Sequence, residues 1–218
     1  MISPFSAMLF DLDGTLVDTA PDLAFALNSL LQQQGFDPLP YDLIRPVASH
    51  GSPGLLSLGF GINSEHPDYP SLQQQFLTLY QENIIRETRL FEGMEKVLSS
   101  LEAANIPWGV ITNKPAFLTE PLLNKLNLSQ RAACIVSADT TPHSKPHPAP
   151  MLHACKVIDH EPTDCIYIGD AQRDIDAGKN VKMQTVTARY GYLTEDDQAE
   201  SWLADAMIDH PTELLQWI

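Results

Sequence analysis

The chain has 218 residues, of which 44% are hydrophobic, and a net charge of −15 at pH 7 with only 13 Lys and Arg residues. This length predicts one large domain, or one domain with a small insert. The charge argues against nucleic acids and anionic membranes as partners, because both bind basic surfaces. The three cysteines are too widely spaced for a disulfide framework or a zinc site. No apolar run reaches membrane-spanning length and residues 1–7 lack signal-peptide features, so we expect a cytoplasmic protein.

The first distinctive stretch is MLFDLDGTLVDT, residues 8–19. Its apolar start predicts a buried strand, and Asp11, Asp13 and Gly14 follow directly. Unpaired buried carboxylates are strongly unfavourable, so this pair requires a cation or a catalytic role. A divalent metal shared with a distant third acid would offset their repulsion. One alternative is a plain strand-to-helix turn. A calcium-binding loop is the other, but its glycine and final acid belong at different positions.

Residues 20–87 show helical patterns and no strand-like alternation. We expect helices at about residues 20–34, 41–47, 53–58 and 71–86. The prediction is an all-α cap domain, residues 20–87, inserted into a core domain made of residues 1–19 and 88–218. A polar loop over residues 48–54 could reach the site, and His50 could equally be a surface loop residue. The candidate substrate residues of the cap are Arg45, Ser49, His50 and Gly51.

A second predicted strand, residues 108–111, ends in Thr112 and Asn113. A hydroxyl and an amide at the end of a parallel strand can donate hydrogen bonds to phosphate oxygens, as can nearby backbone N–H groups. Both residues are therefore candidates for phosphate binding. The alternative for Thr112 is a helix cap, which is a common role for threonine.

Lys145 follows a third predicted strand, residues 134–136, and lies in the loop SKPHPAP. The three prolines of this loop exclude a helix before about residue 149 and stiffen the backbone around Lys145. A cation held in this way would neutralise an aspartate cluster and bind phosphoryl oxygens.

A fourth strand, residues 165–168, leads through Gly169 to Asp170 and then to Asp174. The two acids are four residues apart at the start of a predicted helix, so they face the same way. An acid near a helix N-terminus is the simpler explanation for Asp174.

Further strands are predicted at residues 185–188 and 206–208, and helices separate most of the strands. This alternation predicts an α/β fold, a doubly wound Rossmann-like parallel sheet with helices on both faces. Ligands of such sheets bind at the carboxyl ends of the strands. Asp11, Thr112, Lys145 and Asp170 each belong at that edge.

These four motifs, in this order, resemble those of the phosphatases in the haloacid dehalogenase superfamily. The resemblance implies that Asp11 is the nucleophile, which forms an aspartyl-phosphate, and that Asp13 is the general acid and base. It also implies phosphate binding by Thr112, Asn113 and Lys145. The implied Mg²⁺ ligands are Asp11, Asp13 and Asp170, with Asp174 either holding the metal through water or fixing Lys145. The sequence departs from the family at residues 180–183, where a glycine usually ends the helix.

The helical cap and the Thr-Asn-Lys-Pro and Ser-Lys-Pro-x-Pro variants of the motifs resemble phosphoglycolate phosphatases. The segments at residues 90–94, 108–115, 189–192 and 209–211 resemble more closely still the N-acetylmuramic acid 6-phosphate phosphatase branch. We therefore expect a Mg²⁺-dependent phosphatase that hydrolyses a small phosphate monoester, as a monomer or weak homodimer. A phosphomutase is one alternative. A non-catalytic module that binds a phosphorylated metabolite on the same fold is the other.

Overall fold

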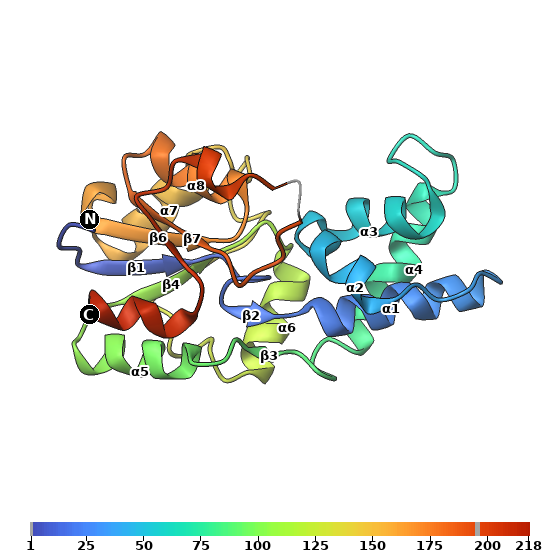
Figure 1. Ribbon diagram of the computed structural model, residues 1–218, viewed down its shortest axis with the longest axis horizontal. Helices are drawn as coiled ribbons and strands as arrows, with labels where there is room; N and C mark the ends of the chain where they lie inside the picture. The colour runs from blue at the N-terminus through green and yellow to red at the C-terminus, as the bar shows by residue number, and fades with distance from the viewer. Residues whose placement is uncertain (1, 195–196) are drawn as a thin grey trace.

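The computed structural model describes residues 2–194 and 197–218. Its centre is a parallel sheet of six strands in the order β5-β4-β1-β6-β7-β8 (Figure 1). This sheet confirms the predicted α/β fold. The strands of the sheet are β1 (Ala7–Phe10), β4 (Trp108–Ile111), β5 (Cys134–Val136), β6 (Cys165–Gly169), β7 (Gln184–Ala188) and β8 (Ala206–Ile208).

Strand β1 is central, and all four of its residues are buried. Met8 and Phe10 join the larger hydrophobic cluster, whereas Ala7 and Leu9 join a second cluster. Because successive side chains of a strand point to opposite faces, β1 contributes to the core on both sides of the sheet. Continuous burial of this kind explains why the strand reads as an uninterrupted apolar run.

Helices cover both faces of the sheet. Figure 1 shows α7 (Ala149–Ile158) and α8 (Gln172–Asn180) on one side and α5 (Met94–Ala103) on the other. The remaining elements of this part are α6 (Ala116–Lys125) and the 3₁₀ turns η2 (Pro162–Asp164), η3 (Ala199–Trp202) and η4 (Pro211–Gln216). After α8 the left-handed conformation belongs to Lys182, with φ 62°, at the place where the family pattern has glycine.

The segment of residues 20–87, which we call the cap segment, lies beside the sheet and contains only helices and turns (Figure 1). Its helices are α1 (Ala20–Gln33), α2 (Tyr41–Ile44), η1 (Arg45–His50), α3 (Gly51–Phe60) and α4 (Tyr69–Glu82). The polar stretch at residues 48–54, expected as a loop, instead runs from η1 into α3. Gly51 permits this junction, because its φ of 60° and ψ of −157° suit glycine alone. The division into two domains stays a prediction.

Two short strands, β2 (Val17–Asp18) and β3 (Arg89–Leu90), pair antiparallel where the chain enters and leaves the cap segment. The buried Asp22 of α1 links the two connections, since it accepts hydrogen bonds from the backbone N–H groups of Glu87 (2.9 Å) and Thr88 (3.0 Å). The two ends of the cap segment are therefore held side by side.

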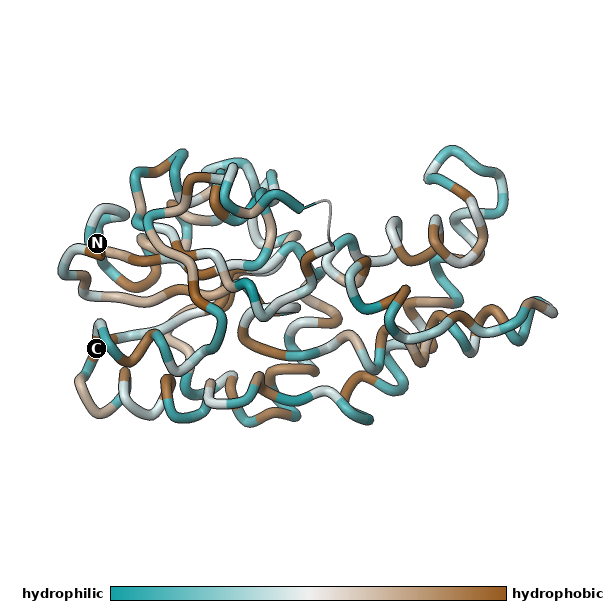
Figure 2. The backbone as a smooth tube through the Cα atoms, viewed as in Figure 1, coloured by the Kyte–Doolittle hydropathy of each residue, from teal (hydrophilic) through white to brown (hydrophobic). Residues whose placement is uncertain are grey.

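Hydrophobic residues concentrate in the strands of the sheet, and the loop between α3 and α4 is largely hydrophilic (Figure 2). None of the helices in the described residues combines the length and the apolar character needed to cross a membrane.

Candidate active site

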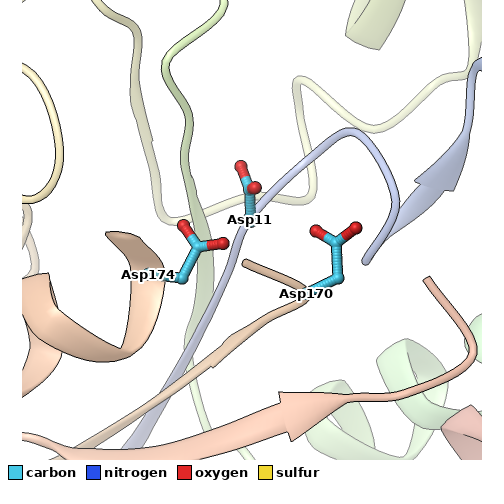
Figure 3. A group of neighbouring side chains, drawn as sticks. All are labelled: Asp11, Asp170 and Asp174. Atoms are coloured by element: carbon cyan, nitrogen blue, oxygen red, sulfur yellow. The ribbon is translucent and has the colours of Figure 1, made fainter. Parts of the chain in front are cut away.

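Three buried carboxylates meet at the carboxyl edge of the sheet (Figure 3). Asp11 follows β1, Asp170 follows the neighbouring strand β6, and Asp174 lies in the first turn of α8. One oxygen from each lies within 4.8 Å of the others. Strand order reverses beside β1, so the cluster occupies the position where doubly wound sheets bind their ligands.

Asp170 is held by donors from three parts of the chain. Its Oδ2 accepts hydrogen bonds from the backbone N–H of Tyr192 (2.9 Å) and the hydroxyl of Ser49 (3.0 Å), and its Oδ1 accepts one from Thr15 (3.2 Å). Gly14 passes so close that a Cβ there would lie 2.2 Å from Asp170 Oδ2, and its φ is +85°. Only glycine fits this position, which explains the Asp-x-Asp-Gly pattern of the first motif.

Lys145 lies between two of the three acids and is fully buried. Its Nζ is 2.9 Å from Asp11 Oδ1 and 2.7 Å from Asp174 Oδ1. It also donates to the carbonyl oxygen of Ile111 and the hydroxyl of Tyr167, each at 2.8 Å. The contact with Asp174 matches one of the two roles predicted for that residue, that of fixing Lys145.

Asn113 makes two hydrogen bonds with the backbone of Lys145. Its amide nitrogen donates to the Lys145 carbonyl oxygen and its amide oxygen accepts from the Lys145 N–H, both at 2.9 Å. The end of β4 thereby fixes the loop that carries Lys145. The neighbouring Thr112 accepts a hydrogen bond from the Lys114 N–H at 3.1 Å, and both Thr112 and Asn113 line the cavity described below. Phosphate binding by these two residues stays a prediction.

The cluster contains more negative charge than its neighbours compensate. Burial and then the charge of Asp174 raise the pKa of Asp11 to about 6, although Lys145 acts in the opposite direction. Burial, followed by the charges of Asp11 and Asp174, raises the pKa of Asp170 to about 7. A divalent cation would reverse both shifts, and carboxylate oxygens are the ligands that Mg²⁺ prefers. The residues present therefore fit such an ion.

Asp13 lies apart from this cluster. Its Oδ1 accepts hydrogen bonds from Thr19 (2.6 Å) and from Lys114 Nζ (2.8 Å). The structure does not bring its carboxylate into the group of three acids, and its role as a metal ligand stays a prediction.

Burial would lower the pKa of Lys114, but Asp13 and Tyr80 together raise it above its ordinary value. Sequence reasoning missed Lys114. A lysine three residues beyond a strand end, in a chain poor in basic residues, was the available signal.

A cavity of about 500 Å³ lies between the cap segment and the sheet. Residues from both parts line it, including Asp11, Asp13, Lys114, Ser49 and His50. Among the predicted cap residues, Ser49, His50 and Gly51 belong to this lining.

Arg45 lies outside the described lining of the cavity. Its guanidinium donates to the carbonyl oxygens of Gly191 (3.0 Å) and Tyr190 (3.1 Å), in the loop after β7. It therefore links the cap segment to the sheet. From the other side, Arg173 of α8 donates to the Ser49 carbonyl oxygen at 2.8 Å and does line the cavity. Arg173 is a second cavity cation that sequence reasoning did not identify.

The family model for haloacid dehalogenase-like hydrolases matches residues 8–188. The chain belongs to this family.

Two bacterial relatives are each 38% identical to the chain over 208 residues. One is an N-acetylmuramic acid 6-phosphate phosphatase from Pseudomonas putida, and the match covers 95% of this chain and 93% of that protein. The other is a phosphoglycolate phosphatase from Xanthomonas campestris, with coverage of 95% and 94%. A crystal structure of a "predicted phosphoglycolate phosphatase" from Haemophilus somnus superposes with a TM-score of 0.87 at 26% identity, over 99% of each chain. The predictions of the family and of a phosphatase are confirmed.

Proposed function

We propose that the protein hydrolyses a small phosphate monoester through an aspartyl-phosphate on Asp11, with Mg²⁺ as cofactor. One observation carries the proposal. Asp11 lines the cavity between the cap segment and the sheet, and the same carboxylate contacts the buried Lys145. A nucleophile in this position has a cation beside it and room for a substrate in front of it.

Each chemical role falls to a residue at this edge of the sheet. Asp11 attacks phosphorus, and the bond between phosphorus and the leaving oxygen breaks. Lys145 and the Thr112 hydroxyl balance the charge of the phosphoryl oxygens. Asp13 gives a proton to the leaving alkoxide. In the second half, Asp13 takes a proton from the water that attacks phosphorus, and the Asp11 carboxylate is released.

Asp11 and Asp170 would hold Mg²⁺, and Asp174 would stay with Lys145 close to the ion. When bound, the ion supplies positive charge to the phosphoryl group and to the acidic cluster. Asp170 is already oriented for this by its hydrogen bonds with Tyr192 and Ser49.

Added Mg²⁺ should raise the thermal unfolding temperature, because it relieves the repulsion among three buried carboxylates. A chelator should reverse that rise and abolish phosphate release. Differential scanning calorimetry and a phosphate assay on the same samples measure both effects. Asp170→Asn should lose most of the Mg²⁺-dependent stabilisation, whereas Asp176→Asn on the same helix should keep it. An equal response of wild type and Asp170→Asn would contradict the placement of the metal.

The size of the cavity bears on the substrate. A volume of about 500 Å³ is more than a two-carbon acid requires, and it lies in the range that holds ligands of the size of a sugar. Polar residues of the cap segment, Ser49, His50 and Gln73, line the same space and could bind sugar hydroxyl groups. These features favour an amino-sugar phosphate such as N-acetylmuramic acid 6-phosphate over 2-phosphoglycolate.

The experiment that tests this preference is phosphate release with Mg²⁺ from the two compounds, compared by kcat/KM. We expect a higher kcat/KM for the amino sugar, and we expect His50→Ala to reduce that value more than the value for 2-phosphoglycolate. A preference for 2-phosphoglycolate, unaffected by His50→Ala, would refute the substrate assignment and leave the phosphatase itself intact.

A further inference from the structure

Lys114 lies at the boundary between the sheet and the cap segment, and none of the steps above uses it. Its side chain is only 7% exposed, and the residue lines the cavity. A buried lysine in a cavity beside the reacting groups calls for an explanation, since burying an ammonium group is strongly unfavourable without partners.

The partners of Lys114 come from both sides of that boundary. Its Nζ donates to Asp13 Oδ1 at 2.8 Å and to the hydroxyl of Tyr80 at 2.9 Å. The ammonium group also lies 4.5 Å from the centre of the Tyr80 ring. Asp13 follows β1 of the sheet, whereas Tyr80 belongs to α4 of the cap segment. Lys114 therefore joins the predicted acid to the cap segment.

The hydrogen bonds of Asp13 are asymmetric. Oδ1 accepts from both Lys114 and Thr19, whereas no donor within the described residues contacts Oδ2. The residue as a whole lines the cavity. Two donors on one oxygen fix the rotation of the carboxylate, which leaves the other oxygen to carry a proton.

We propose that Lys114 and Tyr80 are positioning residues that hold Asp13 so that its Oδ2 delivers the proton to the leaving oxygen. The inference rests on the proposed function of Asp13. As the bond from phosphorus to the leaving oxygen breaks, the proton on Oδ2 passes to that oxygen and Asp13 becomes a carboxylate. The water of the second half returns a proton to Oδ2. Because Tyr80 belongs to the cap segment, Asp13 is fully aligned only while Tyr80 of α4 keeps its hydrogen bond with Lys114.

Two kinds of substrate separate this role from a structural one. The leaving group of N-acetylmuramic acid 6-phosphate is an alkoxide, which needs the proton, whereas 4-nitrophenyl phosphate releases a stable phenolate that does not. The quantity to compare is kcat/KM, because it reports only the steps up to transfer of the phosphoryl group to Asp11. We expect Lys114→Met to reduce kcat/KM for the alkyl ester about tenfold or more, and for the aryl ester less than about threefold.

Asp13→Asn and Tyr80→Phe complete the experiment. Asp13→Asn should show the same selectivity with a larger loss, about 10²-fold or more on the alkyl ester. Tyr80→Phe removes only the hydroxyl and should show a smaller selective loss. Thr78→Val removes an exposed hydroxyl from the same helix, outside the cavity lining, and is the control that should leave both values within about twofold of wild type.

The outcomes distinguish a failure of the positioning role of Lys114 and Tyr80 from a failure of the proposed role of Asp13 as the acid. Equal losses on both esters for Lys114→Met and Tyr80→Phe, while Asp13→Asn remains selective, would overturn the positioning role alone. If Asp13→Asn itself lacks selectivity, the proposed role of Asp13 fails and the inference with it. Should Lys114→Met not fold, Tyr80→Phe decides, because that substitution leaves the ion pair between Lys114 and Asp13 in place.

Discussion

Replacing Asp11 by Asn should lower kcat by about 10³-fold or more while the protein stays folded, since the substitution removes the nucleophile. The fold should not suffer. The pKa of Asp11 is raised to about 6, mainly by burial, so its charged form is disfavoured in the folded protein. At pH 7 the neutral amide relieves that penalty. We therefore expect the unfolding temperature of Asp11→Asn, measured without Mg²⁺, to equal or exceed that of wild type.

The sign of this stability effect depends on pH. A carboxyl group whose pKa is higher in the folded state weakens folding at pH values above that pKa, and the penalty disappears as the group becomes protonated below its unfolded value. The advantage of Asp11→Asn should therefore be largest near pH 7 and should shrink towards pH 4, close to 3.8, the ordinary pKa of an aspartic acid. Asp176→Asn serves as the control with normal turnover. Substantial phosphate release by Asp11→Asn would contradict the mechanism.

Lys145→Met should have the opposite effect on stability and a comparable effect on turnover. Lys145 is buried against Asp11 and Asp174, so its loss leaves both carboxylates without their cation. Removing one partner of a buried ion pair typically lowers the free energy of unfolding by about 3–5 kcal/mol. We also expect kcat to fall about 10²-fold or more, because the phosphoryl oxygens lose a stabilising charge.

Urea unfolding curves and steady-state kinetics measure these two effects. Lys156→Met, an exposed lysine of α7, is the matched control and should change neither quantity. Mg²⁺ should restore more stability to Lys145→Met than it adds to wild type, since the variant has the larger excess of negative charge. A Lys145→Met protein as stable as wild type would show that the acidic cluster does not depend on this lysine.

The strands of the sheet, and the polar residues at their carboxyl ends, could be predicted because both depend on local sequence. A parallel strand buried on both faces reads as a short apolar run, and β1, β4, β5 and β6 were identified in that way. The polar residue directly after each run then falls at the carboxyl edge. Asp11 and Asp170 thus come together across adjacent strands although they are far apart in the sequence.

Contacts that cross between the cap segment and the sheet could not be predicted, because they depend on how the two parts pack. Arg45 was expected to face the substrate, but its guanidinium contacts backbone carbonyl oxygens of the sheet part. Lys114 was passed over, although it joins Asp13 to Tyr80 of α4. In each case the sequence shows the charged residue, but the groups that it contacts are distant in the sequence. No local pattern predicts such a contact.

The end of α8, where the family pattern usually has a glycine, shows a different limit of prediction from sequence. The chain adopts the left-handed turn there with Lys182, at φ 62°. A left-handed lysine costs about 1 kcal/mol relative to glycine, which tertiary packing can offset. The left-handed turn is therefore kept at this position although the sequence has no glycine there.

The measurement that tests the central claim most directly is a rapid acid quench of the wild-type enzyme with Mg²⁺ and N-acetylmuramic acid 6-phosphate, followed by peptide mass analysis. The account predicts a phosphoryl group on the peptide that contains Asp11, formed no later than the first product and absent from Asp11→Asn. A phosphoryl group on any other residue, or a full first turnover with none on Asp11, would contradict it.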